Sequence, residues 1–162
     1  MSGLGGHMMR DLGLVMGVVL ALAGCRGLGV KDEASTELER TFLESEVQVR
    51  ESRTRSSLIE MESALSSFVK QERRIPDKLD ELIPKYMAAI PAVDIGAGGH
   101  RETSDVKYYR SDLLRDGQID GTKLQDSGKW AYVHNDRQVV IFVDCTHPNS
   151  RGRPWYQERG AQ

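Results

Sequence analysis

The sequence predicts an α+β fold in which one long N-terminal helix packs on a small antiparallel sheet of about three strands. No proline and, after Gly29, no glycine interrupts residues 31–74, so nothing there would stop a helix. Short runs rich in aromatic and β-branched residues follow only in the second half of the chain. Apolar residues also recur at steps of three and four, on the one helix face that should meet the sheet: Leu58, Met61, Leu65, Phe68 and Val69.

The N-terminal residues have the layout of an export signal. Arg10 precedes an apolar run from Leu12 to Ala23, and charged residues begin at Lys31. This run is too short to cross a hydrocarbon core, which needs about 20 helical residues, but it suits the apolar region of a secretory signal. The segment "LAGC", which ends at Cys25, resembles the lipobox of bacterial lipoproteins, whose cysteine is lipidated and becomes the new amino terminus. An ordinary signal peptide cut nearby, with Cys25 incidental, is the alternative.

Lipidation of Cys25 predicts a protein of the bacterial cell envelope, anchored to a membrane without spanning it, at the outer membrane or the periplasmic face. Each buried methylene of an acyl chain contributes about 0.8 kcal/mol to such an anchor. Removal of residues 1–24 as the signal peptide leaves 138 of the 162 residues, enough for one domain. The net charge of −2 argues against a nucleic-acid partner, because a phosphate-binding surface is normally basic.

The long helix has two different halves. Between residues 44 and 57 its only apolar residues are Val47 and Val49, so this part cannot bury an apolar stripe and should project into solvent as a stalk. We therefore assign residues 25–57 to the lipidated N-terminus and stalk, and residues 58–162 to an α+β head. Three apolar residues nearer the lipid form either a contact patch or incidental surface: Leu38, Phe42 and Leu43.

A compact connector and three strands are predicted after the helix. Pro76 ends the helix, and Leu79, Leu82 and Ile83 then face one way in a short second helix. The predicted strands begin at Val106, Lys129 and Gln138, with a tight hairpin turn at residues 135–137 between the last two. The loop at residues 111–128, with its glycines and aspartates, should be exposed, and the C-terminal tail looks irregular.

Two motifs resemble type II secretion pseudopilins, particularly major-pseudopilin-like proteins, and type IV pilin-like periplasmic domains. In that family a proline precedes a short helix of spaced leucines followed by Pro, Lys and an aromatic residue, matched here by Pro76, Leu79, Leu82, Pro84, Lys85 and Tyr86. A second motif opens the final hairpin, matched by Asp126, Ser127, Gly128, Trp130 and Tyr132. The resemblance covers residues 58–155 and implies a pilin-like head.

The prepilin cleavage site and the apolar membrane helix of the family have no counterpart in the sequence. Pseudopilins carry a prepilin cleavage site and a continuous apolar helix that forms the filament core, whereas here a lipobox precedes a polar helix. Filament assembly through a buried helix bundle is therefore not expected. The resemblance instead implies a lipid-anchored accessory or structural component of a type II secretion or type IV pilus-like system, with the proteins of that machinery as partners. A stand-alone surface lipoprotein, whose pilin-like head binds a ligand or acts as a scaffold, is the alternative.

Two groups of residues carry side chains of the kinds that bind metals or act in catalysis. Major pseudopilins bind calcium in the loop that corresponds to residues 111–128, so the resemblance implies a calcium site formed from Asp112, Asp116, Asp120 and Asp126. Their spacing fits no common calcium motif and basic residues dilute the charge, so a solvated loop without a cofactor is favoured.

Cys145 and His147 raise the further hypothesis of a thiol enzyme. A structural cysteine is favoured, because catalytic partners usually come from separate elements and no second histidine cluster completes a metal shell. His100 and His134 are isolated in the sequence, and each is expected in a loop or facing solvent. We expect no enzymatic activity.

Overall fold

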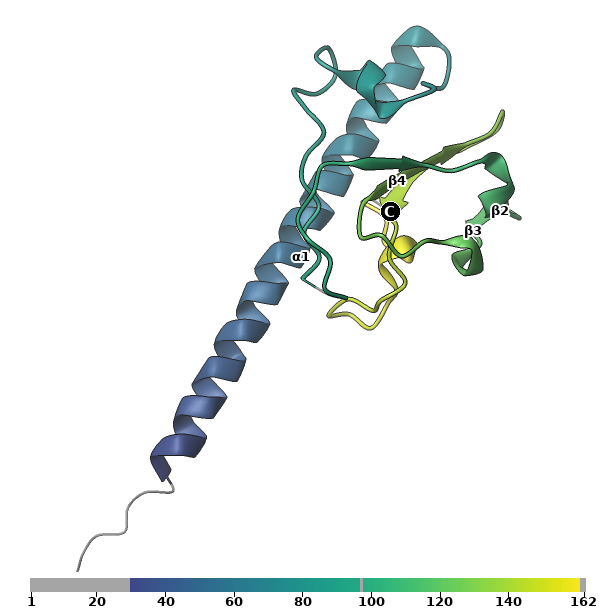
Figure 1. The fold of residues 1–162 in the computed structure, drawn as a ribbon. Coiled ribbons are helices and arrows are strands. Elements are labelled where there is room, and N and C mark those ends of the chain that lie inside the picture. The colour runs from purple at the N-terminus through teal and green to yellow at the C-terminus, as the bar shows by residue number, and fades with distance from the viewer. Residues whose placement is uncertain (1–29, 97, 161–162) are drawn as a thin grey trace, which may run out of the picture.

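The computed structural model describes residues 30–96 and 98–160, with the side chains of the first helix described from Ser35 onward. The predicted signal peptide and Cys25 lie outside the described residues. Figure 1 shows a long helix with a small mixed α+β head packed against one of its halves. The helix and strands are α1 (Val30–Glu72), β1 (Val106–Tyr108), β2 (Leu114–Arg115), β3 (Gln118–Ile119), β4 (Trp130–His134) and β5 (Val139–Val143). Four short 3₁₀ helices, η1 to η4, lie at Leu79–Leu82, Ser111–Leu113, Gly121–Lys123 and Trp155–Gln157.

The predicted long helix is confirmed as a single element of 43 residues. It ends where Arg73 adopts a left-handed φ of 57° and donates its backbone N–H to the Val69 carbonyl, a common helix termination. The predicted apolar face packs on the sheet, and its buried members are Leu58, Met61, Leu65 and Phe68. No described helix combines the length and the apolar character needed to cross a bilayer.

The N-terminal part of α1 runs away from the head (Figure 1). Side chains from Ser35 to Ser45 are exposed, including Phe42 at 65%. The expectation of a solvated stalk as far as residue 57 is wrong for two polar residues. Glu51 and Thr54 are buried, because loops of the head donate and accept hydrogen bonds at this level of the helix. Contact between helix and head therefore begins with polar groups, before the apolar stripe starts.

The main sheet has the order β1-β4-β5 and is mixed, so the prediction of a purely antiparallel sheet is wrong for one of its pairs. β4 and β5 form the expected antiparallel hairpin, with Trp130 opposite Val143. β1 pairs with β4 in parallel, with Val106 opposite Trp130. A parallel pair needs a crossover of a dozen or more residues, and residues 109–129 supply it.

Both faces of β4 and β5 are buried. On the α1 face, Trp130, Tyr132 and Ile141 join the helix and the connector in the larger core. On the opposite face, Val133 and Phe142 join a second, smaller core. This two-sided burial explains why these strands appear as unbroken apolar runs in the sequence.

The second face is covered by the crossover, which was expected to be an exposed loop. Leu113 and Ile119 from this segment are only 2% and 8% exposed, so that expectation is wrong for its apolar residues. β2 and β3 form a hairpin there with a two-residue turn. Both turn residues, Asp116 and Gly117, have positive φ, at 51° and 81°. This is the conformation that Asp-Gly turns favour, and it presents Ile119 to the sheet.

Candidate metal centre

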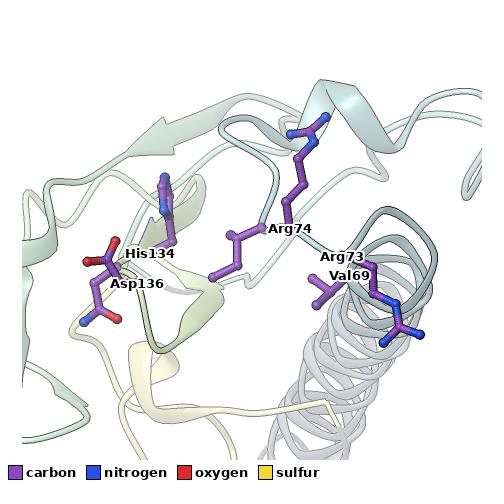
Figure 2. A pocket seen from close by; sticks show the side chains of 7 residues that line it. Val69, Arg73, Arg74, His134 and Asp136 are labelled. Atoms are coloured by element: carbon purple, nitrogen blue, oxygen red, sulfur yellow. The ribbon is translucent and has the colours of Figure 1, made fainter.

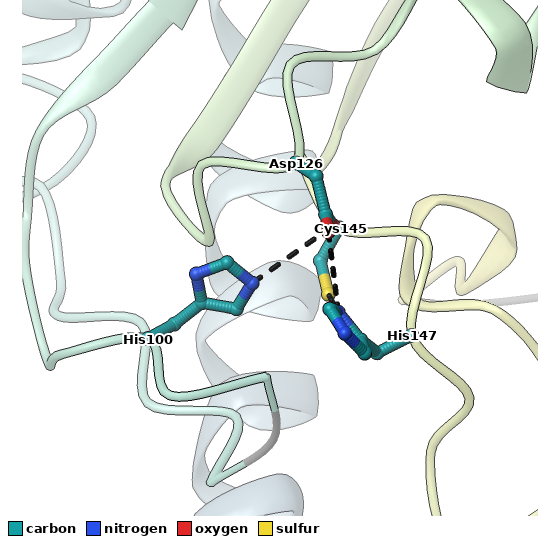
Figure 3. A group of neighbouring side chains, drawn as sticks. All are labelled: His100, Asp126, Cys145 and His147. Atoms are coloured by element: carbon teal, nitrogen blue, oxygen red, sulfur yellow. Dashed lines mark hydrogen bonds and ion pairs between the residues drawn. The ribbon is translucent and has the colours of Figure 1, made fainter.

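Four potential ligands from three separate segments meet at one end of the sheet (Figure 3). His100 lies in the loop before β1, Asp126 lies just before β4, and Cys145 and His147 follow the end of β5. One ligand atom from each residue lies within 4.8 Å of all the others. Among the described residues, no other group of three or more His, Cys, Asp or Glu side chains has this arrangement.

The separations within the cluster are short. Nδ1 of His147 lies 3.4 Å from Sγ of Cys145 and 3.3 Å from Oδ2 of Asp126. Nε2 of His100 lies 3.8 Å from Oδ1 of the same carboxylate. The two imidazole rings meet edge to face, with their centroids 5.6 Å apart. The carboxylate of Asp126 therefore stands between two imidazoles, with the thiol beside it.

Backbone hydrogen bonds hold the ligand-bearing segments in place. Thr146 donates its N–H to Oδ1 of Asp126 at 2.7 Å, which joins the segment before β4 to the segment after β5. The carbonyls of Cys145 and His147 accept the N–H groups of Tyr156 and Trp155, at 3.0 and 3.1 Å. The tail that looked irregular in the sequence thus fixes the position of two of the four ligands.

Two glycines make room for the imidazoles. A Cβ at Gly128 would lie 2.4 Å from Cγ of His100, closer than such contacts occur in proteins. A Cβ at Gly98 would lie 2.6 Å from Nδ1 of His147 and 2.9 Å from Nε2 of His100. Both glycines have positive φ, which glycine adopts without strain. Only a residue without a side chain fits this close to both ligand nitrogens.

The electrostatics of the cluster differ between its two acids. Burial raises the pKa of the Cys145 thiol to about 12, and the nearby carboxylates of Asp126 and Asp144 add to this. For Asp126, burial acts to raise the pKa, but hydrogen bonds from Thr146 and Cys145 and the two histidines outweigh it and lower the pKa. At neutral pH, in the absence of a metal, the cluster therefore holds a carboxylate beside a protonated thiol.

Hydrogen bonding among the four side chains leaves one nitrogen unsatisfied. Nε2 of His100 is buried and has no hydrogen-bond partner within the described part of the chain. Nδ1 of His147 faces both the thiol and the carboxylate but can serve only one of them as donor or acceptor at a time. Buried polar nitrogens normally have a partner, so this one calls for an explanation.

His100 lies in a loop, as expected, but the structure corrects the expectations that it is isolated and that no second histidine completes a metal shell. His100 is not isolated, because its ring meets that of His147, and a second histidine does join Cys145 and His147. Cys145 is a free thiol and fully buried, which is consistent with the structural cysteine favoured from the sequence. Sequence reasoning missed the cluster because its ligands come from loops whose meeting depends on tertiary contacts. The local signals are the close spacing of Cys145 and His147 and the glycines near His100 and Asp126.

The remaining aspartates of the predicted calcium site lie apart from this cluster. Asp112 is exposed beside Lys123 at 3.9 Å, and Asp116 forms the β2–β3 turn. Asp120 caps η3 by accepting the N–H of Thr122. Of these four aspartates, only Asp126 belongs to a group of potential ligands within the described residues. The described structure therefore brings together no set of carboxylates at the predicted calcium site.

His134 lies elsewhere, in a pocket between the end of α1 and the β4–β5 turn (Figure 2). Arg73, Arg74 and Asp136 line the same pocket. Arg74 is already paired with Glu81 at 2.5 Å, which reduces the charge available to an anionic ligand. We therefore assign this pocket no ligand.

Comparison of the chain with protein families, with curated proteins and with solved structures finds no match.

Proposed function

We propose that this chain is a lipid-anchored, pilin-like protein of the bacterial envelope, an accessory or structural component of a type II secretion or type IV pilus-like system. Lipid on Cys25 holds one end at the membrane. The exposed N-terminal part of α1, from Ser35 to Ser45, is called its free part and serves as a spacer. The head offers its sheet edges and loops to a protein of the machinery. The proposed action is presentation of a binding surface and includes no catalytic step.

The observation that carries this proposal is the division of α1. Its C-terminal half is buried against the head, whereas its side chains from Ser35 to Ser45 are exposed. A helix with one half embedded and the other free is suited to hold a head at a distance from an N-terminal anchor. Three large apolar side chains on the free half give it a surface for contact, with exposed fractions of 72%, 65% and 59%: Leu38, Phe42 and Leu43.

The residues that carry the resemblance also occupy structural positions in the head. Leu79 and Leu82 of the first motif are fully buried in η1, and Trp130 and Tyr132 of the second face α1. Such positions are consistent with a shared pilin-like core. The stand-alone surface lipoprotein uses the same anchor and head and differs only in its partner, so the partner decides between the two.

Enzymatic use of the thiol is disfavoured by its surroundings. Cys145 is fully buried, and burial raises its pKa to about 12, whereas a nucleophilic cysteine needs a lowered pKa and access. The proposal therefore assigns Cys145 no catalytic role.

The anchor is tested by replacing Cys25 with alanine. We expect complete loss of metabolic labelling with a fatty acid, together with release of the protein from the membrane fraction or retention of the signal peptide. The physical reason is that the thioether to diacylglycerol requires this thiol. Cys145→Ala is the matched control and should keep full labelling. Labelling that persists in Cys25→Ala would disprove the anchor.

The partner is tested by cross-linking intact cells that produce the full-length protein, followed by mass spectrometry of the purified adducts. We expect adducts with pilin-like subunits or secretion-machinery proteins, and reduced yield of these adducts from Phe42→Ser, since Phe42 is exposed on the free part of α1. Glu44→Ser, on the same stretch, is the control. Adducts that contain only unrelated envelope proteins would overturn the assignment to this machinery and favour the stand-alone lipoprotein.

A further inference from the structure

We propose that His100, Asp126, Cys145 and His147 form a four-ligand Zn²⁺ site. It would bind the metal through Nε2 of His100, Nδ1 of His147, a carboxylate oxygen of Asp126 and the thiolate of Cys145 (Figure 3). This inference does not depend on the function proposed above, since it concerns only the head.

The distances between ligand atoms fit a tetrahedral shell. With Zn–S near 2.3 Å and Zn–N and Zn–O near 2.0–2.2 Å, tetrahedral angles place neighbouring ligand atoms about 3.3 to 3.6 Å apart. Nδ1 of His147 lies 3.3 Å from Oδ2 of Asp126 and 3.4 Å from Sγ of Cys145, and Nε2 of His100 lies 3.8 Å from Oδ1 of Asp126. Since one ligand atom from each residue lies within 4.8 Å of all the others, side-chain shifts of about 1 Å would bring the four atoms to Zn²⁺ geometry.

The donor set selects the class of metal. One thiol, two imidazoles and one carboxylate are the ligand types of zinc, and imidazole with thiolate disfavours hard cations. Calcium takes six to eight oxygen ligands, whereas this cluster supplies a single carboxylate. The site is thus distinct in both place and chemistry from the calcium site that the resemblance implies.

Two independent observations point to a ligand rather than to a purely hydrogen-bonded cluster. Nε2 of His100 is buried without a hydrogen-bond partner in the described structure, and a metal ion would use its lone pair. A Cβ at Gly98 would lie 2.6 Å from Nδ1 of His147 and 2.9 Å from Nε2 of His100, so only a glycine at this position leaves both ligand nitrogens without a side chain against them.

Four protein ligands close the coordination shell, which makes the proposed site structural rather than catalytic. The metal would join the loop that carries His100, the segment before β4 and the segment after β5. Binding would displace the thiol proton of Cys145 to solvent, because a coordinating cysteine binds as thiolate.

The test is metal analysis of the full-length protein, purified without a histidine tag, dialysed against Zn²⁺ and then against buffer. We expect one equivalent of zinc and a higher melting temperature with Zn²⁺ than with Ca²⁺. His147 is half-exposed, so His147→Ala should still fold. Losing an outer-shell partner of a metal ligand weakens binding roughly 10- to 100-fold, and we expect the loss of this ligand itself to weaken zinc binding by more than that. His134→Ala is the matched histidine control and should keep one equivalent.

The absorption spectrum of bound Co²⁺ reports coordination by a thiolate directly, which a change in fold stability alone cannot imitate. Co²⁺ bound to the protein should give a thiolate-to-metal charge-transfer band that is absent in Cys145→Ser and retained in Cys25→Ser, the matched cysteine control. The proposal is overturned if the wild-type protein retains no stoichiometric zinc, if His147→Ala binds zinc as tightly as wild type, or if the cobalt band survives in Cys145→Ser.

Discussion

Replacement of Trp130 with alanine is expected to lower the free energy of unfolding by about 3 to 5 kcal/mol, the usual cost of truncating a large buried aromatic residue. Trp130 is fully buried between the sheet and α1, as its place in the hairpin predicts. Its Nε1–H also donates to the Pro91 carbonyl at 2.7 Å, so the substitution leaves both a cavity and an unpaired acceptor. Urea denaturation of the full-length protein measures the change.

Phe42→Ala is the matched control for Trp130→Ala, because it truncates an aromatic side chain that is 65% exposed. Its effect should remain within about 0.5 kcal/mol. A loss below about 1 kcal/mol in Trp130→Ala would show that the indole is not part of the packed core and would contradict the placement of β4 against α1.

Glu51→Ala is expected to cost about 3 kcal/mol, the lower end of the range for removing one partner of a buried ion pair. Glu51 is 2% exposed, and its carboxylate accepts from Nη2 of Arg55 at 2.8 Å and from the Ser150 N–H at 2.8 Å. It also accepts from the Ser150 hydroxyl. The substitution removes the acceptor of both Ser150 donors and leaves Arg55 only its longer contact with Glu158 at 3.8 Å, and thermal and urea unfolding both report the loss.

Glu44→Ala serves as the control for Glu51→Ala on the same helix. Among the described residues its carboxylate pairs only with the exposed Arg40 at 3.5 Å, so its removal should change stability by less than about 0.5 kcal/mol. Equal effects of the two substitutions would mean that the tail does not dock on α1 through Glu51.

Much of the secondary structure could be predicted from local patterns. The helix follows from a long stretch free of proline and glycine, and β4 and β5 follow from apolar, β-branched runs on either side of an Asn-Asp pair. In the structure a side chain closes this turn. Oδ1 of Asn135 accepts the N–H groups of Arg137 and Gln138, and neither Asn135 nor Asp136 has positive φ.

The features that the sequence did not predict are one very short hairpin and several contacts between distant segments. Asp116-Gly117 is a strong local hairpin signal, yet its flanking strands have only two residues each, too short to show alternation. The direction of β1 relative to β4 depends on how residues 109–129 pack on the sheet, which no local pattern encodes. The cluster of potential metal ligands is missed for the same reason, since only the tertiary fold brings His100 close to Cys145.

The hydrogen bonds between α1 and the tail have a consequence for the order of folding. Ser150 meets Glu51 across 99 positions of the chain, and the Gly160 N–H meets Glu62 across 98. Contacts of such long range are slow to form and cannot exist until residues 150–160 have been made. Synthesis supplies the helix first, so the carboxylates of Glu51 and Glu62 stay solvated until those residues arrive. The head therefore reaches its final packing only after residues 150–160 have been synthesised, and a chain cut short before Ser150 loses the donors that join the tail to the helix.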